Sequence, residues 1–217
     1  MFQAILIIWS IATLLVVIGV LPYAVWLGFM AWRRQWRKLI LRAAIPLVSY
    51  SLITSAVFLS GYIHQKLYFD TIFDTKAGLG KPLFEYDSPR AFNGDGYSLT
   101  VYGLSPAIRK RFENPDARLL SQFPKFPSER SQWAMEPWRQ APVETRFRKH
   151  VDFALSSYDQ DQNPHLRDHF SAIESSLAGD SAYYAFFWFN HGDNVGDIDF
   201  FLVDLKGGLI YVINHNT

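Results

Sequence analysis

The chain has 217 residues, a net charge of +1 and a mean hydropathy near zero, and it contains no cysteine. The absence of cysteine excludes disulfide bonds, zinc sites built on thiolates and cysteine nucleophiles. The averages conceal an uneven distribution, because residues 1–63 hold five basic residues and no Asp or Glu. The other 154 residues carry 16 basic and 20 acidic residues, and they are numerous enough to form one domain with its own core.

Two long apolar stretches dominate the N-terminal region. Residues 1–32 carry no charge, and residues 43–63 form a second uncharged stretch. A helix rises about 1.5 Å per residue, so each stretch is long enough to cross a hydrocarbon core of about 30 Å. Neither stretch alternates as a barrel strand would. The sequence therefore predicts a transmembrane helical hairpin over residues 1–63, with helices at about 4–32 and 43–63.

The five basic residues lie together between these apolar stretches, in residues 33–42. Short loops rich in Lys and Arg stay in the cytoplasm, so this loop is predicted to be cytoplasmic and residues 64–217 to lie on the other side. Tryptophans beside the loop are typical of the membrane interface. The predicted membrane-interface residues, in contact with the lipid bilayer, are Trp32, Arg33, Arg34, Trp36, Arg37, Lys38 and Arg42.

The next segment, residues 64–82, is predicted to be a linker that continues the second helix and loosens near its glycines. The sequence Asn93-Gly94-Asp95-Gly96 is then typical of a tight turn. It precedes Tyr97–Tyr102, which alternates and is rich in strand-forming residues. We expect a hairpin between this strand and Leu83–Asp87.

Helices and a loop follow this hairpin. Ser105-Pro106 combines a capping residue with proline at the first helical position, and it predicts a helix over Ala107–Glu113. A short helical turn is expected within Asp116–Phe123. Residues 124–142 contain four prolines, which block both helices and strand pairing, so this stretch is predicted to be an irregular loop pinned by tryptophans.

The C-terminal part combines helical and strand patterns. Apolar residues recur at helical spacing in Val143–Tyr158 and from Asn163-Pro164 to Leu177. Three strands are predicted after these helices: Tyr183–Asn190, Asp197–Asp204 and Leu209–Asn214. Residues 83–217 are therefore predicted to be a soluble α+β domain with an antiparallel sheet and helices on one face.

Catalytic and metal-binding motifs are weak. His165 and His169 have a spacing that zinc can use, but Leu166 stands where a metalloprotease needs glutamate, so two exposed histidines are the simpler interpretation. Residues 191–199 are rich in oxygen ligands but lack the spacing of an EF-hand, so a turn and a solvated strand explain them better than calcium. No nucleophile elbow or phosphate loop occurs. We expect no cofactor, no metal and no enzymatic activity.

Charge is also divided within residues 64–217. Residues 64–150 carry a net charge of +4, whereas residues 151–217 carry −8. Such asymmetry can steer a basic protein partner, although a solvated acidic face would show the same pattern. The acidic part would repel phosphates, so nucleic acid is excluded as a partner. The candidate partner-binding residues are Asp193, Asp197, Asp199 and Asp204.

Several short motifs together suggest a family. They are Gly94-Asp95-Gly96-Tyr97-Ser98-Leu99, Tyr102-Gly103-Leu104, Phe112-Glu113-Asn114-Pro115, Phe123-Pro124-Lys125, Ala141-Pro142-Val143 and Ile213-Asn214-His215-Asn216-Thr217. In these motifs the chain resembles a group of uncharacterised bacterial inner-membrane proteins, some of which are similar to immunity proteins of secreted antibacterial toxins. The resemblance implies a multi-pass inner-membrane protein with a periplasmic domain, and possible partnership with a toxin. It transfers no functional residue.

Two other functions stay open at this point. Small residues in the second apolar stretch favour close helix packing, as in an envelope sensor or a subunit of an inner-membrane complex. A hydrolase of envelope polymers would need Glu85, Asp95 and Asp193 to converge in a cleft. The leading hypothesis is a membrane-anchored periplasmic protein that binds its partner directly.

Overall fold

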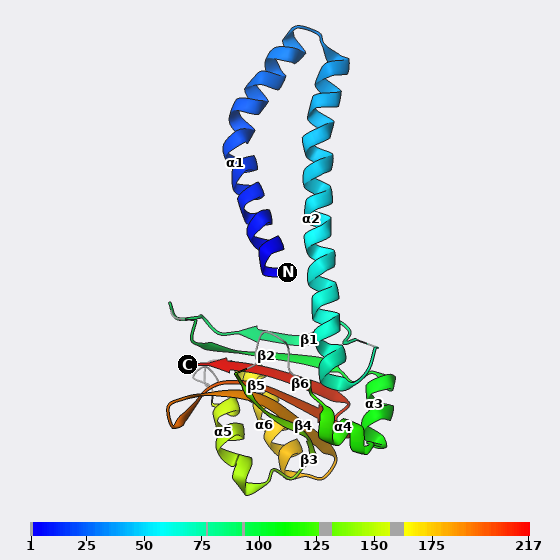
Figure 1. The fold of residues 1–217 in the computed structure, drawn as a ribbon, viewed down its shortest axis with the longest axis vertical. Coiled ribbons are helices and arrows are strands. Elements are labelled where there is room, and N and C mark those ends of the chain that lie inside the picture. The colour runs from blue at the N-terminus through cyan, green and yellow to red at the C-terminus, as the bar shows by residue number, and fades with distance from the viewer. Residues whose placement is uncertain (1, 77, 93, 126–131, 157–162) are drawn as a thin grey trace. The chain divides into compact units, whose positions relative to one another are not determined.

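The computed structural model of the protein describes residues 2–76, 78–92, 94–125, 132–156 and 163–217. The chain divides into two compact units, Met1–Gln65 and Lys66–Thr217. Figure 1 shows the first as helical and the second as a sheet with helices.

The first unit is built from helix α1 (Phe2–Trp32) and the larger part of helix α2 (Trp36–Phe73). Each helix contains one proline, Pro22 in α1 and Pro46 in α2. Proline has no N–H to donate, so the carbonyl one turn earlier loses its helical partner. Figure 1 shows α1 as a bowed helix, and proline is a common cause of helix bending.

The connection between α1 and α2 is shorter than the sequence predicts. The basic loop is expected to span residues 33–42, but α2 begins at Trp36, so Arg37, Lys38 and Arg42 are helical. Lys, Arg and Leu are good helix formers, and a basic cluster does not by itself end a helix. Arg34 adopts a left-handed conformation at the turn, with φ of 56°.

Length and composition identify one helix in the described part of the chain, α2, as long and apolar enough to cross a membrane. In α1, Val17–Trp32 is a shorter apolar stretch. Large apolar side chains on both helices are exposed, including Val25 at 74% and Phe58 at 72%. Trp32 and Trp36, which the sequence predicts at a membrane interface, are also exposed.

The second unit is an α+β structure with one antiparallel sheet of six strands, in the order β1-β2-β6-β5-β4-β3. The strands are β1 (Pro82–Asp87), β2 (Gly96–Gly103), β3 (Ala134–Gln140), β4 (Ala182–His191), β5 (Asn194–Asp204) and β6 (Leu209–Asn216). Its helices are α3 (Pro106–Glu113), α4 (Ala117–Gln122), α5 (Arg148–Leu155) and α6 (Pro164–Ala178), with a short 3-10 turn at Thr145–Phe147.

Five of the six strands, and the pairing of β1 with β2, agree with the sequence prediction. The sixth, β3, lies within residues 124–142, where an irregular loop is predicted. This prediction is wrong because Pro137 sits in an edge strand, at an irregularity of the pairing between Glu136 and Arg139. Edge strands and bulges are the places where a sheet tolerates proline.

The predicted helix over Val143–Tyr158 is shorter in the structure. A 3-10 turn at Thr145–Phe147 precedes α5, which ends at Leu155, and Tyr158 lies outside the described residues. The cap of α3 at Ser105 and the start of α6 after Asn163 agree with the prediction. In both helices the side chain of the capping residue, Ser105 or Asn163, accepts a hydrogen bond from a backbone N–H in the first turn.

Helices cover both faces of the sheet, so the prediction of helices on one face is wrong. We call the two sides the α6 face and the α3 face. Val151, Phe170 and Phe186 belong to the core of the α6 face, together with other residues of α5, α6 and the sheet. Phe112 and Phe201 belong to the core of the α3 face. Successive side chains of a strand point to opposite faces of the sheet. Because successive residues in the first part of β4 are all buried, both faces of the sheet must be covered.

The last turns of α2 belong to the second unit. Phe69, Ile72 and Phe73 join the core of the α3 face, although the sequence places residues 64–82 in a linker. The indole N–H of Trp138 donates a 2.8 Å hydrogen bond to the carbonyl of Ile72. The ring of Trp138 also packs against Phe73, with 5.5 Å between ring centroids. Two helical turns of the expected linker are therefore part of a folded core.

Candidate binding surface

One part of the α3 face is polar. Residues directly opposite each other in antiparallel strands project from the same face, so the register defines rows across the sheet. One row consists of Asp87, Ser98, Asn214 and Asp199, and the adjacent row consists of Gly96, Asn216 and Asp197. We call these seven residues the polar rows. They bring together three carboxylates and three neutral polar side chains from four strands.

Asp199 connects the polar rows to the end of α2. Its side chain is buried, with 4% exposure. One carboxylate oxygen accepts a 2.6 Å hydrogen bond from the amide of Asn214, and the other accepts a 3.3 Å bond from the hydroxyl of Tyr68. A buried carboxylate is costly unless it is hydrogen-bonded, and these contacts supply that compensation.

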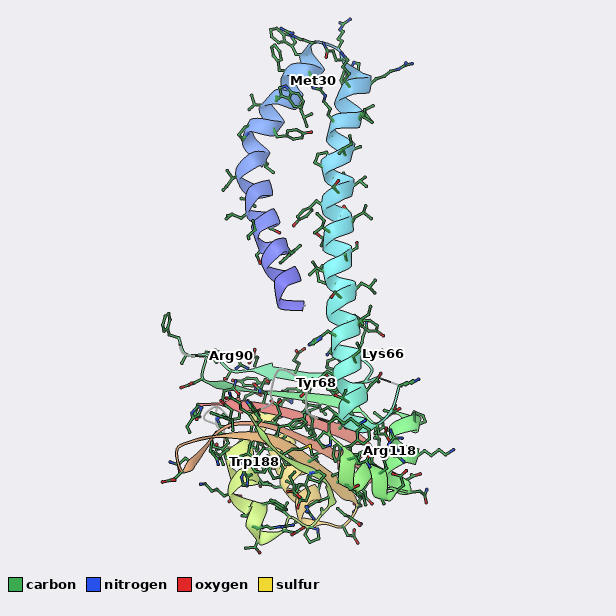
Figure 2. The ribbon with its side chains drawn as sticks, viewed as in Figure 1. Met30, Lys66, Tyr68, Arg90, Arg118 and Trp188 are labelled. Atoms are coloured by element: carbon green, nitrogen blue, oxygen red, sulfur yellow. The ribbon has the colours of Figure 1, made fainter. Side chains whose placement is uncertain are left out.

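Arg90 supplies a positive charge at the other end of the rows. Its guanidinium contacts a carboxylate oxygen of Asp87 at 3.2 Å and the side-chain oxygen of Asn214 at 3.5 Å. A side chain at Gly96 would leave no space for this arrangement, since a Cβ there would lie 2.9 Å from the hydroxyl of Ser88 and 3.2 Å from Cγ of Arg90. Gly96 also has φ of +155°, which favours glycine. Figure 2 labels Arg90 and Tyr68 on this side of the sheet.

The loop between β1 and β2 holds a fully exposed aromatic residue. Phe92 has a relative exposure of 111%, the highest among the exposed large apolar residues described. Hydrogen bonds fix its surroundings: the N–H of Ala91 donates to the carbonyl of Asp95, and the guanidinium of Arg90 donates to the carbonyl of Gly94. The described part of this loop therefore presents a phenyl ring to solvent, and the loop leads directly into β2 at Gly96, a member of the polar rows.

The four predicted partner-binding residues do not form one surface. Asp197 lies in the polar rows, half-buried, with a carboxylate oxygen 3.4 Å from Nε2 of His191. Asp199 lies beside it but is buried. Asp204 belongs to the α6 face, where it accepts hydrogen bonds from Ser176 and from the N–H of Gly207, so it stabilises the fold. Asp193 lies in the β4–β5 turn, where its carbonyl accepts a hydrogen bond from Lys149.

Of the two histidines weighed as zinc ligands, one is exposed as expected and the other is half-buried. His169 packs its ring 4.5 Å from the ring of Phe84, and burial lowers the pKa of His169. His165, one turn earlier, is exposed. Within the described parts of the chain, no group of three or more histidine or carboxylate residues is placed to hold a metal ion.

Cavities occur in both units of the described chain. One, of about 600 Å³, lies beside α5 and α6 and includes the charged residues Arg148, Asp152 and Glu174 in its lining. The other, of about 720 Å³, lies between α1 and α2 in the first unit. Neither lining includes Glu85, Asp95 or Asp193, the carboxylates considered for a hydrolase.

Comparisons with family models, with curated proteins and with solved structures find no match to this chain.

Sequence reasoning missed most of the polar rows. It identified Asp197 and Asp199, but not their juxtaposition with Asp87, Ser98 and Asn214. The neighbours of Asp199 depend on β6 lying between β2 and β5, which is a long-range pairing. Within β5, Asp197 and Asp199 share one face, and Ile198 lies in the core of the opposite face.

Proposed function

We propose that the protein is a membrane-anchored binding protein that uses the polar rows and Phe92 to capture a protein partner. The observation that carries the proposal is the fully exposed ring of Phe92, in the loop that joins Asp87 and Gly96 of these rows. Exposing a large apolar side chain to water is unfavourable, and aromatic residues and arginine are enriched at protein interfaces. The adjacent carboxylates of Asp87 and Asp197 favour a partner with a basic surface around an apolar pocket.

We also propose where the protein lies in the cell. Residues 1–63 combine long apolar stretches with five bases and no acid, which supports a transmembrane hairpin with its basic turn in the cytoplasm. The second unit would then lie in the periplasm of a bacterium. A reporter enzyme fused after Thr217 should be active only outside the cytoplasm. Activity confined to the cytoplasm would contradict this topology.

Binding can be tested by charge reversal at one residue of the polar rows. Asp197→Lys should abolish co-purification of the partner with the full-length protein from detergent extracts. Asp180→Lys makes the same change in charge at an exposed site outside the rows, and it should leave co-purification intact. Equal retention of the partner by both variants would contradict binding through the polar rows.

Immunity to a toxin is the specific form of binding that the sequence resemblance suggests. If it applies, expression of the chain should protect bacteria against a toxin encoded by a neighbouring gene. Protection should be lost in Asp197→Lys and kept in Asp180→Lys. Unchanged survival of cells that lack the chain would rule out immunity, while leaving the binding of another partner open to the co-purification test.

A further inference from the structure

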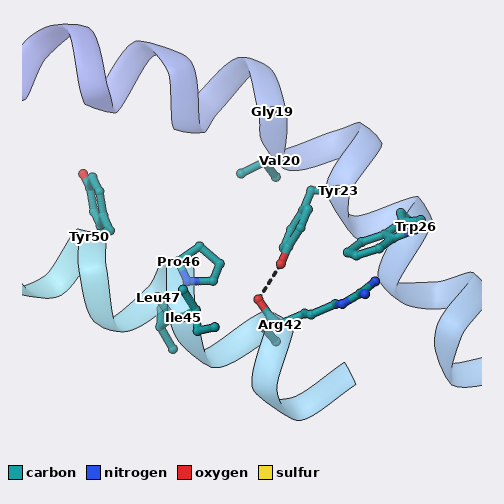
Figure 3. A pocket seen from close by; sticks show the side chains of 10 residues that line it. Gly19, Val20, Tyr23, Trp26, Arg42, Ile45, Pro46, Leu47 and Tyr50 are labelled. Carbon is teal, nitrogen blue, oxygen red and sulfur yellow. Dashed lines mark hydrogen bonds between the residues drawn. The ribbon is translucent and has the colours of Figure 1, made fainter. Parts of the chain in front are cut away.

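The cavity between α1 and α2 is almost entirely apolar in its lining. Ten residues line its volume of about 720 Å³, and Arg42 is the only charged residue among them. Such a volume is within the range of about 300–1,000 Å³ that is typical of small-molecule sites. Figure 3 shows Val20, Tyr23 and Trp26 on α1, opposite Arg42, Pro46 and Tyr50 on α2.

A proline fixes the geometry at one end of this cavity. Pro46 has no N–H, so the carbonyl of Arg42, one turn earlier in α2, lacks its usual helical donor. The hydroxyl of Tyr23, on α1, donates a hydrogen bond to this carbonyl. An unsatisfied carbonyl is costly where water is excluded, so this bond ties the two helices together beside the cavity.

The side chain of Arg42 adds a positive charge at the same place. Its guanidinium lies 4.8 Å from the ring centre of Trp26, and one of its nitrogens lies 3.8 Å from the sulfur of Met30. Both of these partners are neutral, and residues 1–63 contain no carboxylate. A guanidinium has five N–H donors in a planar arrangement that matches a phosphate group.

We propose that this cavity binds an anionic phospholipid, with an acyl chain in the apolar cavity and the phosphate held by Arg42. The proposal rests on the membrane anchoring proposed above. Charge complementarity supports this occupant, since the bases Arg33, Arg34, Arg37 and Lys38 lie close to Arg42 in the sequence and no acid accompanies them. Basic pockets between membrane helices are typical sites for anionic lipid headgroups.

The headgroup contact can be tested with the full-length protein in nanodiscs. The protein is released from discs that contain equal amounts of phosphatidylglycerol and phosphatidylcholine, and the retained lipids are counted by native mass spectrometry. The wild-type protein should retain phosphatidylglycerol preferentially. Arg42→Gln should lower this preference about tenfold, whereas the matched variant Arg37→Gln, which also removes one charge but lies outside the cavity lining, should keep it. An equal loss of the phosphatidylglycerol preference in both variants would overturn the assignment of the phosphate contact to Arg42.

The acyl-chain contact has its own pair of variants. Gly19 lines the cavity, and a Cβ added there meets no atom within 4 Å, so Gly19→Leu can place its side chain in the cavity. Gly28, in the same helix, has equally free space but does not line the cavity. Gly19→Leu should reduce retention of phosphatidylglycerol, and Gly28→Leu should not. Full retention by Gly19→Leu would overturn the placement of the acyl chain.

Membrane anchoring is measured separately in the same preparation. Insertion into discs of pure phosphatidylcholine depends on the apolar helices and not on the headgroup. Insertion without any preference for phosphatidylglycerol would overturn the lipid site alone. Failure to insert would overturn the membrane anchoring, and the lipid site with it.

Discussion

The two faces of the six-stranded sheet are built from alternate residues of the same strands, yet they differ in how far the apolar core extends. On the α6 face, β2, β4, β5 and β6 all contribute apolar side chains to one cluster under α5 and α6. On the α3 face, the apolar cluster lies under α3, α4 and the end of α2. The polar rows occupy another part of the same face. The first arrangement stabilises the fold through the burial of apolar area. The polar rows stabilise it only where a member such as Asp199 is buried and hydrogen-bonded.

The largest effect should come from the apolar part of the α3 face. Trp138→Ala removes a side chain with 1% exposure, its hydrogen bond to Ile72 and its ring contacts with Phe73 and Phe112. We expect the free energy of unfolding to fall by about 3–5 kcal/mol. Urea-dependent pulse proteolysis of the full-length protein in detergent measures this change. A loss below about 1 kcal/mol would contradict the anchoring role of Trp138.

A smaller effect on the free energy of unfolding should distinguish Asp199 from Asp197, two neighbouring carboxylates of the polar rows. Asp199→Ala leaves the amide of Asn214 and the hydroxyl of Tyr68 without their acceptor, so it should cost about 1–3 kcal/mol. Asp197→Ala removes a half-buried group beside an exposed histidine, and should cost no more than about 0.5 kcal/mol. Equal losses of stability would contradict the assignment of Asp199 to the fold and Asp197 to the surface.

The α6 face should make stability depend on pH. Burial lowers the pKa of His150, which packs its ring against Phe186 and Trp188. The unfolded chain therefore takes up a proton near pH 6.5 while the folded chain does not, so stability should fall as the pH drops from 7 towards 5. His150→Phe should make this decline shallower. Chemical denaturation at several pH values measures it, and an unchanged slope in His150→Phe would contradict the prediction.

The smallest effect on stability is expected at the tip of the β1–β2 loop. Phe92 is fully exposed, so Phe92→Ser should change the free energy of unfolding by less than about 0.5 kcal/mol. The same substitution should abolish co-purification of the partner. A binding defect together with a large loss of stability would contradict the proposal that Phe92 serves binding alone.

The same comparison explains how far the sequence could predict the fold. Local signals were sufficient for the hairpin of β1 and β2, for the cap at Ser105, for the start of α6 after Asn163 and for the C-terminal strands. β3 was missed because a proline normally excludes a strand, and its tolerance at Pro137 depends on an edge position that only the full sheet defines. Helices on both faces were missed for a related reason, since the end of α2 joins the core from a distant part of the sequence.

The candidate site was less predictable than the fold. Acidic composition pointed to Asp197 and Asp199, but the burial of Asp199 depends on Tyr68 and Asn214, from two distant segments. Asp204 could not be separated from them by composition, because its structural role comes from Ser176 in α6 and the turn at Gly207. The exposure of Phe92 is likewise a property of the folded loop.

The central claim is that the loop tip and the polar rows contact a partner protein in the cell. A photo-crosslinking amino acid placed at position 92 of the full-length protein tests it most directly, with position 110, exposed on α3, as the control. The account predicts a discrete protein adduct from position 92 that is absent at position 110 and disappears with Asp197→Lys. The same adducts from both positions, or an adduct at position 92 that Asp197→Lys leaves unchanged, would contradict it.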